Sequence, residues 1–88
     1  MLRISIRDES EENIQLALEG WLVGPWVDEL RQQSDRALSD PKRVTLDCEK
    51  LWFADPSGIA LLRELAKRRV TQINCSTFIS QQLKESTV

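Results

Sequence analysis

The chain has 88 residues, a hydrophobic fraction of 41% and a formal net charge of −2. Its length suits one small domain with one modest hydrophobic core. The mixed charges give no electrostatic reason to expect a nucleic acid or an acidic membrane as a partner.

The same inventory argues against several kinds of site and location. The sequence has no histidine and no Cys-x-x-Cys pair, so we expect no metal site, and without a glycine-rich phosphate loop we expect no cofactor. Met1–Ile4 leads straight into an alternating strand, and no apolar run is long enough to span a membrane. We therefore expect no signal peptide, no direct membrane insertion and a cytoplasmic location. Cys48 and Cys75 should then be reduced, buried thiols rather than a disulfide.

The first half of the predicted sheet is an antiparallel hairpin. Apolar and polar residues alternate over Leu2–Ile6 and again over Ile14–Glu19, with the acidic stretch Asp8–Glu12 between them. Alternation with a period of two is typical of strands that have one buried and one solvated face. The acidic stretch is interpreted as a solvated turn rather than a binding tail.

A helix is predicted from Pro25 to about Leu38, after a break over Gly20–Gly24. Ser39-Asp40-Pro41 should end it, because proline disfavours helix in the residue before it. The alternating segment Val44–Cys48 follows as a third strand. A helix between two strands implies a right-handed crossover, so the third strand should lie parallel to its neighbour. The predicted buried stripe of the helix consists of Trp26, Val27, Leu30, Ala37 and Leu38.

The clearest element is the helix that follows this strand and a bend. Asp55 is a good N-cap, and Pro56 occupies the first helical position, where its missing N–H costs nothing. Lys67 and the basic residues after it suit the negative end of the helix dipole. A helical wheel groups on one side Gly58, Ile59, Leu61, Leu62, Leu65 and Ala66.

The chain closes with a weak strand and a short helix. Thr71–Cys75 is assigned as the last strand mainly from its position, and Ser76 can cap a helix. The inward-facing residues of that helix should be Phe78, Ile79 and Leu83. The order of elements predicts a single α/β domain over residues 1–88, with three helices packed on a small four-stranded mixed sheet.

Four segments resemble the STAS domain, the family found in anti-sigma factor antagonists and in the tails of sulfate transporters. They are Leu18–Leu22, Val44–Asp47, Phe53–Leu62 and Asn74–Phe78, and together they span nearly the whole chain. The resemblance implies the STAS fold and no catalytic activity. It also implies bacterial partner switching, in which a kinase phosphorylates the domain and so controls which protein it binds.

The resemblance also locates the phosphorylation switch, and there this chain departs from the family pattern. The pattern is Asp, a phosphorylated Ser or Thr, a small or hydroxyl residue and Gly, of which Asp55 and Gly58 match. Pro56 stands at the phosphoacceptor position and has no hydroxyl, while Ser57 comes one residue later. Val23 stands where family members tend to have Asp after the second strand. These departures argue against an antagonist with the usual switch.

Several candidate residues also have purely structural interpretations. Ser57 is expected to join the helix cap more readily than to accept phosphate. Asp55 should cap the helix rather than act as an acid, because no second carboxylate or base is placed with it. Trp21 and Trp52 fall near strand ends, where the pattern fits an exposed, partner-contacting tryptophan as well as a buried one.

The sequence therefore favours a non-catalytic protein-interaction module. Its partner would be an anti-sigma or other kinase-like protein, a sensory complex or a transporter ATPase, bound without phosphorylation at the usual position. The first alternative is a domain that senses a nucleotide or an anion at a helix N-terminus, and an enzyme has the least support. Ser57 is the alternative phosphorylation site. The expected partner-binding residues, at one edge of the sheet, are Val23, Gly24, Asp55, Pro56 and Ser57.

Overall fold

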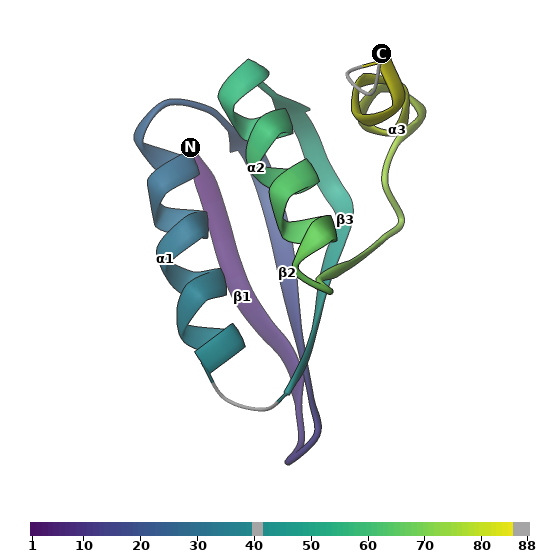
Figure 1. Cartoon of the computed structure of the whole chain (residues 1–88). Helices are drawn as coiled ribbons and strands as arrows, with labels where there is room; N and C mark the ends of the chain where they lie inside the picture. The colour runs from purple at the N-terminus through teal and green to yellow at the C-terminus, as the bar shows by residue number, and fades with distance from the viewer. Residues whose placement is uncertain (40–41, 86–88) are drawn as a thin grey trace.

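The computed structural model describes residues 1–39 and 42–85, which form a four-stranded mixed sheet and three helices (Figure 1). The strands lie in chain order, with β1 antiparallel to β2 and with β2, β3 and β4 parallel to one another. This arrangement confirms the predicted fold class. The bounds are β1 Leu2–Glu9, β2 Asn13–Leu22, α1 Pro25–Ser39, β3 Arg43–Ala54, α2 Pro56–Lys67, β4 Thr71–Ile73 and α3 Thr77–Glu85.

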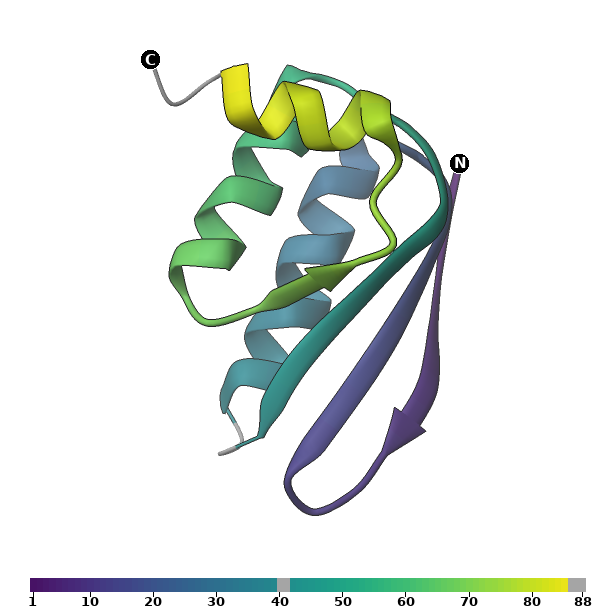
Figure 2. The same cartoon turned by 90° about the vertical axis from the view of Figure 1, so that its right-hand side faces the viewer.

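Two helices form a layer on one face of the sheet. α1 and α2 lie side by side there, and α3 lies across the end where β3 stops and α2 begins (Figures 1 and 2). In Figure 2 no helix of the described chain covers the opposite face of the sheet. Every second residue of each strand points to the face that the helices cover, so the core lies between the sheet and the helices. No helix among the described residues combines the length and the hydropathy needed to cross a membrane.

The long strands run further than the sequence predicted. β1 continues to Glu9, β2 to Leu22 and β3 to Ala54. The expected end of the third strand at Cys48 and the expected break from Gly20 onward are therefore wrong. The segment before α2, expected to be a bend, is the last part of β3.

Irregular pairing between β2 and β3 explains the error. The register shifts between Ala17 and Glu19 and again between Gly20 and Trp21. An extra residue at such a point sends the following side chains to the other face, so the period of two is lost in the sequence. One consequence is that Trp21 pairs with Phe53 near the end of the sheet.

Helix α2 buries nearly the face that the helical wheel predicted. The exception is Ala66, which is exposed because it lies at the margin of the apolar arc in the last turn. The buried residues of α2 are Gly58, Ile59, Leu61, Leu62 and Leu65.

Helix α1 has the predicted start and ends at Ser39, while the predicted stop signal at residues 40–41 lies outside the described residues. Val27 and Leu30 are buried as expected, and Ser34, which the apolar stripe missed, is buried beside them. Ser34 lies one turn beyond Leu30, so it faces the core although it is polar. The predicted residues that are only partly buried are Trp26, Ala37 and Leu38.

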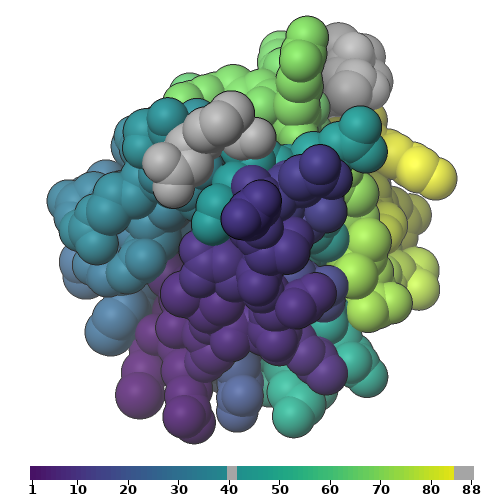
Figure 3. Space-filling view, turned by 90° about the horizontal axis from the view of Figure 1, so that it is seen from below, coloured from purple at the N-terminus to yellow at the C-terminus, as the bar shows by residue number. Residues whose placement is uncertain are grey.

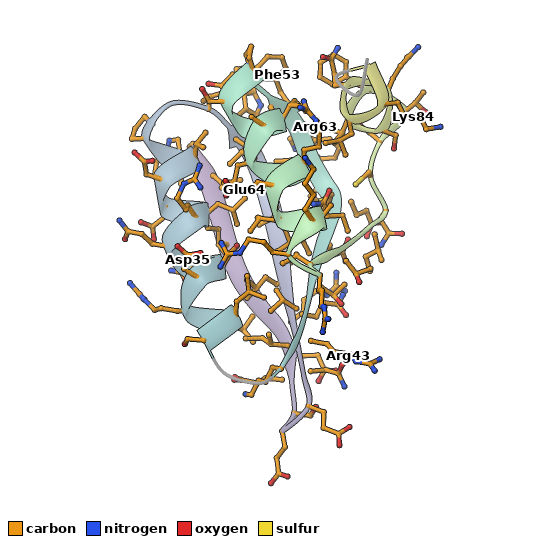
Figure 4. All side chains as sticks on the ribbon, viewed as in Figure 1. Asp35, Arg43, Phe53, Arg63, Glu64 and Lys84 are labelled. Carbon is orange, nitrogen blue, oxygen red and sulfur yellow. The ribbon has the colours of Figure 1, made fainter. Side chains whose placement is uncertain are left out.

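Exposed ion pairs join the outer sides of α1 and α2. Arg31 contacts Glu64 at 2.6 Å, and Arg68 contacts Asp35 at 2.7 Å. Figure 4 labels Asp35 and Glu64 on the two neighbouring helices. Such solvated pairs contribute little to stability, about 0–1 kcal/mol each.

Strand β4 is shorter than predicted. It covers only Thr71–Ile73, because Asn74 has a φ of 59° that turns the chain out of the strand before Cys75. Both cysteines are free thiols, Cys48 buried and Cys75 partly buried. A hydrogen bond with Cys75 and burial both raise the pKa of the Cys48 thiol, so Cys48 is protonated in the core.

Helix α3 is capped as expected and buries two of the three residues predicted to face inward. The Ile79 N–H donates to the Ser76 hydroxyl at 3.2 Å, and Ile79 is fully buried while Leu83 is partly buried. The prediction that Phe78 faces inward is wrong, since it is exposed. Ile79 and Leu83 lie one turn apart on the inner side, which leaves Phe78 about 100° around the helix.

Asp47 is a buried carboxylate on the sheet face that no helix covers. Its Oδ1 accepts from the Asn74 amide at 3.1 Å and from the Glu49 N–H at 3.0 Å, and its Oδ2 pairs with Arg7 at 3.0 Å. These contacts, led by the Asn74 hydrogen bond, hold the pKa of Asp47 below its ordinary value. The carboxylate thereby ties β1 and the segment after β4 to β3.

This lowered pKa predicts a specific loss of stability in acid. The unfolded carboxylate returns to its ordinary pKa, so the stabilisation by Asp47 is complete above that value and is lost as the pH falls through the folded pKa. Denaturant unfolding of the parent and of Asp47→Asn, measured from about pH 7 to about pH 2.5, should show a stability difference that shrinks with acidification. If the stability difference between the parent and Asp47→Asn stays constant with pH, the acid sensitivity belongs to other groups. Glu11→Gln, in the exposed turn, is the control for the loss of one negative charge.

Candidate functional site

The ends of two parallel strands bring the predicted site residues together. β2 ends at Leu22 and β3 at Ala54, so the loop after β2 and the turn after β3 lie at the same edge of the sheet (Figure 1). The Gly24 N–H donates to Oδ2 of Asp55 at 3.1 Å, and the Asp55 N–H donates to the Leu22 carbonyl at 3.1 Å. The two connections are thus joined directly.

Asp55 also caps α2, as predicted. It has an extended backbone (φ −77°, ψ 174°), and its Oδ1 accepts from the Gly58 N–H at 2.7 Å. A carboxylate at this position satisfies one of the free N–H groups of the first turn and suits the positive end of the helix dipole. Because both of its oxygens are engaged, Asp55 positions the turn rather than offering a free acid.

Two glycines make the close approach of the two connections feasible. Gly24 has a φ of +55°, a conformation that residues with a Cβ rarely adopt. At Gly58 an added Cβ would come within 2.6 Å of the Leu22 carbonyl oxygen. The first turn of α2 therefore packs directly on the backbone at the end of β2.

The exposed part of this junction is the turn surface, which we define as Val23, Gly24, Asp55, Pro56 and Ser57. Gly24, Pro56 and Ser57 are exposed, while Val23 and Asp55 are partly buried. All five residues that the sequence predicted as a partner-binding set thus lie together and reach the surface.

An aromatic strip lies beside the turn surface, and it consists of Trp21, Phe53 and Phe78. The Trp21 and Phe53 ring centroids are 6.1 Å apart in a tilted pair, and those of Phe53 and Phe78 are 5.8 Å apart in a stacked pair. Trp21 is 55% exposed and Phe78 44% exposed, and Trp52 is exposed as well. Phe53 and Pro56 line the same groove, so the strip and the turn surface are continuous.

The sequence pointed to Trp21 and Trp52 but missed Phe53 and Phe78. Phe53 was assigned to a bend and Phe78 to the core, so neither was a candidate for contact. Phe53 could have been found as a contact candidate from its position in the sequence, because it lies two residues before Asp55, the N-cap of a helix whose first turn is exposed. Exposed aromatic clusters on small proteins often mark contacts with another molecule.

The rest of the described surface offers less chemistry. Among residues 1–39 and 42–85 no group of three potential metal-binding side chains comes together. Figure 3 shows the end of the molecule opposite the turn surface, which the β1–β2 hairpin and the beginning of β3 form. Lys42, the residue before β3, pairs with Glu9 at the end of β1 at 2.7 Å.

A family model described as "Mlab, STAS domain" matches residues 6–77. A solved structure of the anti-sigma factor antagonist SpoIIAA in its unphosphorylated form is similar, with a TM-score of 0.75 and 19% sequence identity. The similarity covers 93% of this chain and 82% of the SpoIIAA chain, and at that identity it shows a shared fold. No curated protein sequence matches the chain.

Proposed function

The chain belongs to the STAS domain family, and from this premise we propose that it is a non-catalytic module that binds a protein partner through the turn surface. This proposal rests mainly on the observation that the turn surface is continuous with an exposed aromatic strip. Aromatic side chains supply much of the binding energy at protein interfaces. A rigid, hydrogen-bonded junction also loses little conformational entropy when it binds.

We further propose that the partner is bound without a phosphate switch. The family resemblance puts the phosphoacceptor at Pro56, which has no hydroxyl, and Pro56 is exposed beside the aromatic strip. Together with Val23 it makes the turn surface more apolar than the family pattern would. An apolar surface of this kind suits a partner that stays bound.

The proposed partner is an anti-sigma or kinase-like protein, a sensory complex or a transporter ATPase, met in the cytoplasm. The neighbouring genes discriminate between these classes. A sigma regulator encoded beside this chain would support a signalling role, and a permease with an ATPase would support a role in transport.

The alternative, a site for a nucleotide or another anion at the start of α2, has less support. The Asp55 carboxylate already accepts from the Gly58 N–H and places a negative charge where the anion would bind. The Asp55 carboxylate would therefore repel an anion bound at the start of α2.

The test of the proposed function is capture of the partner from source cells with the tagged full chain. We expect the same partner from untreated and phosphatase-treated extracts, because binding needs no phosphate. We also expect no phosphopeptide that contains Ser57 when the chain itself is recovered and analysed by mass spectrometry. A partner retained in only one of the two extracts, or a modified Ser57, would contradict constitutive binding.

A further inference from the structure

A groove runs between α2 and α3 and opens at the turn surface. Ile59 and Arg63, one turn apart, form its α2 side, and Phe78 and Gln82, one turn apart, form its α3 side. Phe53, Ala54 and Pro56 close the end that meets the turn surface. Its volume of about 380 Å³ can take a side chain of the size of leucine or phenylalanine.

Arg63 places a positive charge beside this largely apolar groove. Its side chain lies on the side of α2 that faces α3 (Figure 4), and its Nε is buried without a hydrogen-bond partner among the described residues. The described residues that line the groove include no carboxylate. A guanidinium with no anionic neighbour is unfavourable beside apolar side chains, and a carboxylate is the group that matches its geometry and charge.

We propose that this groove binds an acidic, apolar segment of the partner protein, whose apolar side chain packs against Phe53 and Phe78 while a carboxylate pairs with Arg63. This inference rests on the proposed function and names the chemistry of the partner. The groove shares Pro56 with the turn surface, so a partner that covers the turn surface reaches the groove as well.

The spacing within the groove sets the spacing in the partner. Ile59 and Arg63 are separated by four residues, which is about 6 Å along a helix. The apolar side chain and the carboxylate of the partner should therefore lie within about four positions of each other. Pairing in a largely apolar groove is stronger than on an open surface, because water screens it less.

The experiment selects random dodecapeptides displayed on phage against the immobilised full chain. We expect the enriched peptides to carry Asp or Glu within four positions of an aromatic or aliphatic residue. A synthetic copy of the best peptide should bind the parent at least about tenfold more weakly after its acidic residue is changed to the amide. The unmodified peptide should bind Arg63→Gln more weakly than the parent by a similar factor. Combining the two changes should cause little further loss, since both remove the same pair.

Controls keep the result specific to the groove. Arg36→Gln makes the same chemical change on the exposed side of α1 and should bind the peptide like the parent. Phe78→Ala removes an exposed aromatic side chain, so it should fold normally and bind the peptide weakly. Equal thermal melts of all variants would show that lost binding is not lost folding.

Several outcomes would overturn the proposal. Enriched peptides without acidic residues, or equal binding to the parent and to Arg63→Gln, would remove the role of Arg63. A parent that dimerises while Arg63→Gln stays monomeric would assign the groove to a second copy of the chain. If Ser57→Asp abolishes binding of the captured partner and Arg63→Gln leaves it unchanged, the groove proposal fails and the turn surface stands. If neither variant weakens binding of the captured partner, the turn surface is not the binding site either.

Discussion

Replacing Leu62 with alanine should lower the free energy of unfolding by about 2–5 kcal/mol. Leu62 is 0% exposed and lies in the middle of the α2 face that packs on the sheet. The loss combines the transfer of its side chain from water with the cavity left in a close-packed core. Small domains are stable by only about 5–15 kcal/mol, so the variant should be near the limit of folding at 37 °C.

Urea unfolding followed by circular dichroism measures this effect, with Lys67→Ala as the matched control. Lys67 is exposed in the last turn of the same helix, and its loss should change stability by no more than about 0.5 kcal/mol. Both variants should keep the parent's dependence on urea concentration. Similar midpoints for the two variants would show that α2 packs through a different face.

The sequence was sufficient for those parts of the fold that have local signals. Asp55 and Pro56 mark the start of α2 through cap and proline chemistry, and the apolar arc around Leu62 marks its buried face. The position of the turn surface also followed from the sequence, because the ends of parallel strands lie at one edge of a sheet.

What the sequence missed depends on contacts between distant segments. The irregular pairing of β2 with β3 hid the last part of β3, since alternation is lost wherever an extra residue is inserted. Phe78 is apolar, so a helical pattern alone placed it in the core. Its contact with Phe53 exists only because α3 folds across the end of β3.

The detailed contacts of the site could not be predicted from the sequence for the same reason. No local pattern reveals that Gly58 packs on the Leu22 carbonyl or that the Asp55 carboxylate reaches Gly24. The buried Nε of Arg63 was equally hidden, because a helical wheel leaves Arg63 outside the apolar arc of α2 and takes no account of α3.

A negative charge on the turn surface should abolish partner binding without unfolding the protein. Ser57 is exposed in the first turn of α2, where the helix dipole favours an acidic residue, so Ser57→Asp should melt at or slightly above the parent's temperature. The charge would nevertheless be desolvated beneath a bound partner and lie beside Asp55, and both effects oppose binding. Val23→Glu should act in the same way from the other connection.

The measurement that tests the central claim most directly is the affinity of the captured partner for these variants, determined by calorimetry with purified proteins. Ser57→Asp and Val23→Glu should each raise the Kd by about 100-fold or more, which corresponds to about 2.7 kcal/mol. Asn13→Asp is the control, because it adds the same charge at the exposed first residue of β2, at the other end of the strand from the turn surface, and should bind like the parent. If Ser57→Asp and Val23→Glu bind the partner with the parent's Kd, the turn surface is not the binding site.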